Sequence, residues 1–124
     1  MQQPVRAYIG IGSNLDHPAT QVRRAFAALN AIPTSLCVAQ SPLYRTAPVG
    51  GPPNQPDYIN AVAALDTALA PEVLLTALQA IETVQGRVRT APWGPRTLDL
   101  DLLLYGEFTR ADSWLTLPHP RLHQ

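Results

Sequence analysis

Two aspartates in an apolar run are the residues of greatest chemical interest. Asp99 and Asp101 interrupt the leucines of residues 98–104, a run too short for a helix, so it predicts a strand. Side chains alternate between faces along a strand, so both carboxylates share one face while Leu98, Leu100 and Leu102 face the core. Neighbouring carboxylates repel each other when they lose hydration, and a hard divalent cation relieves this. The pattern predicts a metal site; a solvent-facing Asp-x-Asp on an edge strand is the structural alternative.

Three arginines lie within a dozen residues upstream of the aspartates, in a segment that also holds two glycines and two prolines. This composition predicts a loop, so Arg87, Arg89 and Arg96 form a basic loop opposite the carboxylates. Arginine clamps oxyanions, and carboxylates hold Mg²⁺. Together these groups are the components of a phosphoryl-transfer site.

The overall composition excludes several classes of protein. The chain has 124 residues with nine basic and nine acidic side chains, so its net charge is zero and nucleic acid is not favoured as a partner. The single cysteine, Cys37, rules out an intrachain disulfide, and no run approaches the ~18 apolar residues of a membrane span. We therefore predict one cytoplasmic, monomeric domain over residues 1–124, with no nucleic-acid or membrane partner.

Hydrophobic periodicity predicts the elements that position these residues. Gly12 and the two residues after it predict a turn at the end of the first strand, in preference to a phosphate cradle. The order matches the ferredoxin-like βαββαβ sandwich of the α+β class, with the aspartate strand toward the sheet edge. In chain order we expect strand 5–11, a helix from Pro18 to Pro33, strand 36–44 with a possible extension to Thr46, strand 57–65, a helix from Pro71 to Gly86, and strand 98–104.

Two further pairs of polar or aromatic residues share a face. Tyr58 and Asn60 lie on one face of strand 57–65, directly after the long proline-rich loop 47–56. An amide beside an aromatic ring offers a two-way hydrogen-bonding edge, although a satisfied structural amide is the alternative. Gln79 and Glu82 are neighbours on the second helix, and the default interpretation is a solvated face.

These motifs closely resemble the 6-hydroxymethyl-7,8-dihydropterin pyrophosphokinase family of folate biosynthesis. The resemblance covers essentially the whole chain, and its Gly-Pro-Arg-Thr-Leu-Asp-Leu-Asp run is highly specific. The matching runs are Ile11-Gly12-Ser13-Asn14, Tyr44-Arg45-Thr46, Gln55-Pro56-Asp57-Tyr58-Ile59-Asn60, Gln85-Gly86-Arg87-Val88-Arg89, Trp93-Gly94-Pro95-Arg96-Thr97-Leu98-Asp99-Leu100-Asp101 and Leu117-Pro118-His119.

The resemblance implies that the β,γ-pyrophosphoryl unit of ATP passes to the pterin hydroxymethyl group, releasing AMP. It implies that Asp99 and Asp101 hold two Mg²⁺ ions and that Arg87 and Arg96 stabilise developing charge. The other implied ATP contacts are Gln79, Glu82, Arg89, Leu102, Thr116 and His119. The implied pterin contacts are Thr46, Ala47, Pro48, Val49, Tyr58, Asn60 and Trp93.

The end of the chain departs from the family pattern. Family members continue past Gln124 into an arginine that contacts ATP and a phenylalanine opposite Tyr58, so we expect this chain to lack a C-terminal segment. Two alternative functions are a noncatalytic ferredoxin-like ligand-binding module and another metal-dependent nucleotidyl transferase. Mg²⁺-dependent protection by ATP would argue against the first, and AMP as the product would argue against the second.

Overall fold

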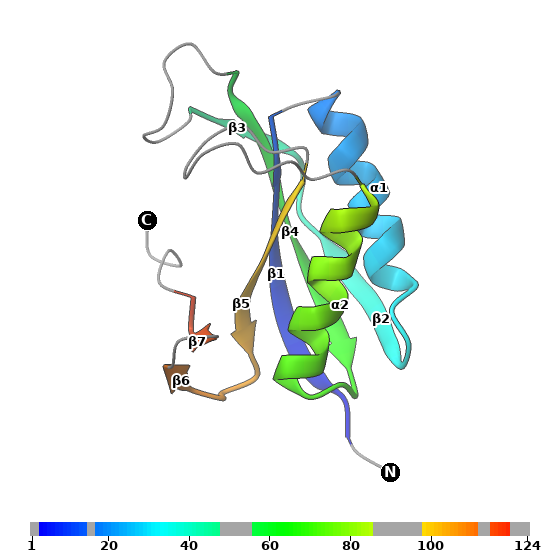
Figure 1. Cartoon of the computed structure of the whole chain (residues 1–124), viewed down its shortest axis with the longest axis vertical. Helices are drawn as coiled ribbons and strands as arrows, with labels where there is room; N and C mark the ends of the chain where they lie inside the picture. Colours follow the sequence, from blue (N-terminus) through cyan, green and yellow to red (C-terminus); the bar gives the residue numbers. More distant parts are fainter. Residues whose placement is uncertain (1–2, 15–16, 48–55, 86–97, 112–114, 120–124) are drawn as a thin grey trace.

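The computed structural model describes residues 3–14, 17–47, 56–85, 98–111 and 115–119. Within these residues, the main antiparallel sheet has five strands and carries both helices on the same side (Figure 1), and a separate sheet has two short strands. The predicted α+β class and βαββαβ order are confirmed, with an added short hairpin formed by β6 (Arg110–Ala111) and β7 (Thr116–Leu117). The elements are β1 Val5–Ser13, α1 Pro18–Asn30, β2 Ser35–Gln40, β3 Tyr44–Thr46, β4 Tyr58–Thr67, α2 Pro71–Val84, β5 Asp99–Tyr105, β6 Arg110–Ala111 and β7 Thr116–Leu117.

The main sheet has the order β2-β4-β1-β5, with β3 also paired to β4. Strands β1 and β4 are therefore central, and β5, which carries both aspartates, lies at the end of the order as predicted. The predicted single strand 36–44 is wrong, because it is divided into β2 and β3 at residues 41–43. Pro42 has no N–H to donate to a neighbouring strand, so it interrupts the ladder. Beside it, the N–H of Ser41 donates to the carbonyl of Val62 and the hydroxyl oxygen of Ser41 accepts the N–H of Val62, each at 2.8 Å.

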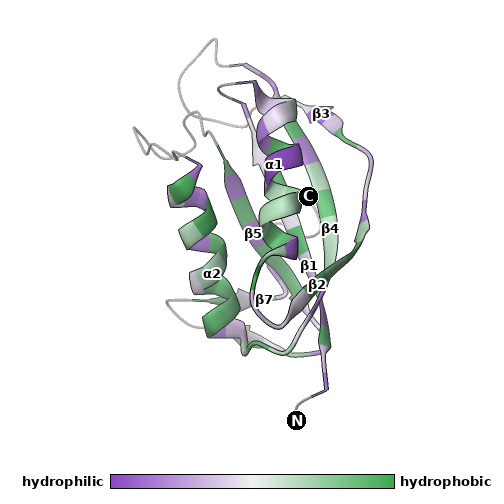
Figure 2. Ribbon diagram, turned by 90° about the vertical axis from the view of Figure 1, so that its right-hand side faces the viewer, coloured by the Kyte–Doolittle hydropathy of each residue, from purple (hydrophilic) through white to green (hydrophobic). Residues whose placement is uncertain are grey.

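The core lies between the helices and one face of the sheet. Helix α1 packs on β1, β2 and β4, and α2 packs on β5, as the two helices in front of the sheet in Figure 2 show. The sheet face opposite the helices carries the other set of alternating side chains. The largest fully buried apolar side chains are Ile9, Val22, Leu29, Leu65, Leu74, Leu78, Leu98 and Leu102.

The predicted turn at Gly12 is also wrong, because β1 continues through Ser13. Gly12 is paired on both sides, with Asn60 in β4 and Asp99 in β5, so the ladder holds it extended. Helices α1 and α2 both begin at a proline, as predicted, because a missing N–H is harmless in the first turn. Within the described part of the chain, no helix is long and apolar enough to cross a membrane.

Candidate functional site

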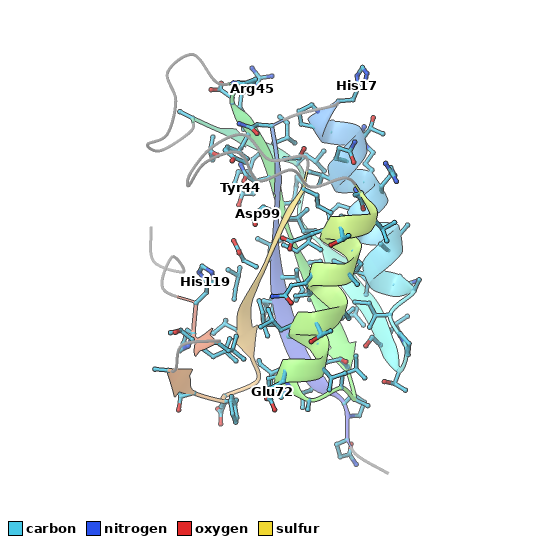
Figure 3. All side chains as sticks on the ribbon, in the orientation of Figure 1. His17, Tyr44, Arg45, Glu72, Asp99 and His119 are labelled. Atoms are coloured by element: carbon cyan, nitrogen blue, oxygen red, sulfur yellow. The ribbon has the colours of Figure 1, made fainter. Side chains whose placement is uncertain are left out.

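A row of four residues crosses the open face of the sheet. The strand registers pair Tyr44 of β3 with Asn60 of β4, Asn60 with Gly12 of β1, and Gly12 with Asp99 of β5. Directly paired residues of antiparallel strands project on the same face, so these positions face the same solvent-accessible side. Figure 3 shows Tyr44 and Asp99 on the side of the sheet away from both helices, with His119 on that side as well.

One end of this row brings together three residues that sequence reasoning assigned to the pterin. The side-chain nitrogen of Asn60 donates to Thr46 Oγ1 at 2.7 Å, which leaves the amide oxygen over Gly12. A Cβ built on Gly12 would lie 3.1 Å from Asn60 Oδ1 and 3.6 Å from Cδ1 of Tyr58. Gly12 therefore makes room for the amide and the ring together. Ala47, also assigned to the pterin, is exposed directly after Thr46.

Sequence reasoning missed Gly12 as part of this site. Two glycines two residues apart inside a strand are the signal that could have identified it, because a strand glycine often marks a close approach by another group. Gly10, the other glycine, would place a Cβ 3.4 Å from the flexible side chain of Leu103, which is a much looser fit.

The other end of the row holds the predicted metal ligands. Asp99 and Asp101 are half-buried on the open face, whereas Leu98, Leu100 and Leu102 are buried in the core, as predicted. Oδ1 of Asp101 lies 3.6 Å from Nε2 of His119, and the backbone N–H of His119 donates to the carbonyl of Leu103 at 2.9 Å. The hairpin β6–β7 thus ends with its histidine beside the aspartate strand.

A pocket of about 260 Å³ lies beside β5, where α2 and β7 meet it. Its walls are mainly apolar, and its polar groups are a carboxylate, a hydroxyl and an imidazole. Four residues that the sequence assigned to ATP or its metals, Asp101, Leu102, Thr116 and His119, lie around this one pocket. The full described lining is Leu75, Leu100, Asp101, Leu102, Leu115, Thr116 and His119.

A larger pocket of about 530 Å³ lies elsewhere, where the start of α1 meets β4. Its described lining includes His17, Arg45 and Asp57 but none of the residues assigned to the pterin, ATP or metal. The volume of a pocket therefore does not identify the nucleotide site in this protein. The smaller pocket is the better candidate because it adjoins the aspartates.

Glu82 does not lie on a solvated face, so the default interpretation of that position is wrong. Gln79 is exposed, but Glu82 is only 5% exposed, and its Oε2 accepts the N–H of Leu100 at 2.8 Å. The missed signal is the spacing of four, because Glu82 follows Leu74 and Leu78 at the next position of the buried stripe.

A buried amide pair joins the two helices near this site. Nε2 of Gln85, the residue after α2, donates to Oε1 of Gln21 at 3.0 Å and to its backbone carbonyl at 3.2 Å. The remaining sequence-predicted site residues lie outside the described residues: Pro48, Val49, Arg87, Arg89, Trp93 and Arg96.

The two aspartates suit a hard cation. They place carboxylate oxygens at alternate positions on an accessible face, the ligand type that Mg²⁺ prefers. Among the described residues, no group of three or more His, Cys, Asp or Glu side chains could surround an ion. Mg²⁺ commonly binds through one or two protein carboxylates and completes its coordination with water and substrate phosphates, so the two aspartates suit this ion.

Comparison with known proteins points to one enzyme family. A sequence model of the family described as 7,8-dihydro-6-hydroxymethylpterin-pyrophosphokinase (HPPK) matches residues 8–124. A Pseudomonas putida protein named 2-amino-4-hydroxy-6-hydroxymethyldihydropteridine pyrophosphokinase is 55% identical over 119 residues, covering 96% of this chain and 98% of that protein. Proteins of the same name from Pseudomonas aeruginosa and Haemophilus influenzae are 54% and 47% identical, covering 92% and 96% of this chain and 70% and 74% of their own lengths.

Proposed function

This chain belongs to the 7,8-dihydro-6-hydroxymethylpterin-pyrophosphokinase family, and we propose how its open sheet face performs the reaction. The protein is a pyrophosphokinase of folate biosynthesis that acts on 6-hydroxymethyl-7,8-dihydropterin with ATP as co-substrate. The observation that carries the proposed site is the row from Asn60 through Gly12 to Asp99. It spans two strand spacings, about 10 Å, so a flat bicyclic ring held at one end can extend a substituent toward the carboxylates at the other.

The pterin binds at the Asn60 end of the row in this proposal. The Tyr58 ring stacks on one face of the pterin, and the Asn60 amide pairs with the donor and acceptor groups of its edge. The hydrogen bond to Thr46 supports this role because it fixes which end of the amide faces Gly12. Ala47, Pro48, Val49 and Trp93 complete the pocket in the same proposal.

The nucleotide binds in the pocket beside β5. Its leucine walls suit the faces of a purine, and Thr116, Asp101 and His119 lie where the polar part of the nucleotide would leave the pocket. His119 then interacts with the phosphates. Gln79 and Arg89 are the remaining residues that we assign to the nucleotide, whereas Glu82 is buried against β5, where its Oε2 accepts the N–H of Leu100.

Asp99 and Asp101 would hold two Mg²⁺ ions, which neutralise charge on the phosphate oxygens when bound. Asp99 is the end of the row toward which the pterin substituent points, so Asp99 and Asp101 would hold the cation-bound phosphates in line with the attacking hydroxyl oxygen. That oxygen forms a bond to the β-phosphorus and loses its proton to solvent as the bond between this phosphorus and the α,β-bridging oxygen breaks, and AMP leaves with the bridging oxygen. Arg87 and Arg96 stabilise the charge that develops on the bridging oxygen.

The direct test is the nucleotide product formed in the presence of Mg²⁺, ATP and 6-hydroxymethyl-7,8-dihydropterin. We expect AMP to accumulate only when the pterin is present, and only with a divalent cation. Formation of ADP, or AMP formation that does not depend on the pterin, would contradict the proposed reaction. Family membership already favours catalysis over the noncatalytic ligand-binding alternative.

A further inference from the structure

Glu82 places a carboxylate in the protein interior beside the strand that carries both aspartates. The residue is 5% exposed, and its Oε2 accepts the backbone N–H of Leu100 at 2.8 Å. Leu100 is the residue between Asp99 and Asp101. A side chain of α2 therefore contacts the β5 backbone midway between the two proposed metal ligands.

The position of β5 in the sheet explains why this contact matters. On one side, β1 pairs with β5 through Gly12 and Asp99, and through Gly10 and Asp101. Backbone groups alternate in direction along an antiparallel strand, and the N–H of Leu100 points away from β1, to the side of α2. An edge strand needs a partner for such groups, because an unpaired buried N–H costs free energy. Glu82 is that partner for Leu100.

We propose that Glu82 is a positioning residue, which fixes the orientation of Asp99 and Asp101 by holding the N–H of Leu100. This inference rests on the proposed function of the two aspartates as metal ligands. A pair of carboxylates binds a cation well only when their relative positions are held closely, and outer contacts that orient ligands typically change metal affinity by about 10- to 100-fold. Glu82 acts in this way through the backbone of the strand.

The chemistry of the side chain distinguishes this role from a direct contact with the ligand. Burial of a carboxylate is costly unless hydrogen bonds replace its water. If Glu82 acts as an acceptor for Leu100, the metal affinity of the site depends on the length of the Glu82 side chain and not on its charge. If Glu82 instead contacts the nucleotide or a cation directly through its charge, the charge matters at least as much as the length.

Two substitutions separate length from charge. Glu82→Gln keeps the length and one oxygen acceptor but removes the charge, whereas Glu82→Asp keeps the charge but is one methylene shorter. Glu82→Met, which keeps the length without an oxygen acceptor, replaces Glu82→Asp if that variant does not fold. Leu78→Ala is the matched control, because Leu78 is a fully buried residue on the same helix face whose truncation lowers stability without removing this bond.

The experiment measures Mn²⁺ binding by electron paramagnetic resonance in the presence of α,β-methylene-ATP, together with amide hydrogen exchange of Leu100. We expect E82D to require about tenfold more Mn²⁺ for half-saturation and to lose protection at Leu100, whereas E82Q stays within about threefold of the wild type. L78A should unfold at a lower temperature and bind Mn²⁺ normally below its transition.

Two results would overturn the proposal. If Leu100 loses protection in E82D while Mn²⁺ binds normally, the hydrogen bond is structural only. If E82Q loses as much affinity as E82D, the charge of Glu82 acts on the ligand directly. Asp99→Asn is measured in parallel, because normal Mn²⁺ binding by that variant would instead overturn the metal assignment on which the proposal rests.

Discussion

Asp101 and His119 are separated by the whole β6–β7 hairpin in sequence, yet Oδ1 of Asp101 lies 3.6 Å from Nε2 of His119. The backbone hydrogen bond from His119 to Leu103 holds this arrangement. The separation is longer than a hydrogen bond, and both side chains line the pocket beside β5. A carboxylate and an imidazole at the mouth of an apolar pocket form the centre of the proposed nucleotide site.

Removal of either aspartate should lower turnover strongly without unfolding the protein. We expect Asp99→Asn and Asp101→Asn to lower kcat by about 100-fold or more, because each change removes a proposed metal ligand and a bound metal ion supplies several kcal/mol of transition-state stabilisation. Steady-state assays at saturating Mg²⁺ and thermal melts check this. Asp66→Asn is the control, because Asp66 is a partly exposed carboxylate that is hydrogen-bonded to Arg6 at the far end of β4. Normal rates in both aspartate variants would contradict the assignment of Asp99 and Asp101 as metal ligands.

Addition of a methyl group at Gly12 should weaken pterin binding more than the same change at Gly10. The new Cβ at Gly12 would lie 3.1 Å from Asn60 Oδ1, so the amide must move, whereas at Gly10 it would meet the flexible Leu103 at 3.4 Å. Overpacking of this kind costs about 1–2 kcal/mol, so we expect about a tenfold loss of pterin affinity in Gly12→Ala. Calorimetric titration in the presence of an ATP analogue measures it, and equal affinities for the two variants would place the pterin elsewhere.

A large side chain in the pocket beside β5 should block the nucleotide. Leu75 lines this pocket, and Leu75→Trp should lower affinity for Mg²⁺–α,β-methylene-ATP by about tenfold or more, because the indole fills space meant for the ligand. Val73→Trp is the matched control, since Val73 is 53% exposed on the same helix and is not part of the pocket lining. Unchanged affinity in Leu75→Trp would contradict this location for the nucleotide and would favour the larger pocket at His17 and Arg45.

Local patterns in the sequence predicted much of this site. Alternation in residues 98–104 correctly predicted that Leu100 is buried while Asp99 and Asp101 share the other face. The apolar stripes and first-turn prolines predicted both helices, because these signals depend only on neighbours along the chain.

Relationships across the sheet could not be predicted in this way. The strand register places Gly12 between Asn60 and Asp99, and no local pattern in the sequence specifies a register. The error at Glu82 has a different cause, because the position was judged by its polarity although its spacing from Leu78 places it on the buried stripe. Only its partner, Leu100 on a distant strand, lay beyond a local pattern. The break at Pro42 was missed because the residues around it are also compatible with an extended chain.

The central claim is that the open sheet face transfers two phosphoryl groups as one unit to the pterin. The most direct measurement is mass spectrometry of the pterin product after a single turnover with ATP labelled with ¹⁸O at the β- and γ-phosphates. We predict a pterin that carries both labelled phosphates, with unlabelled phosphate remaining in AMP, and no such product from Asp101→Asn. A singly phosphorylated pterin, or a pterin that carries the α-phosphate, would contradict the account.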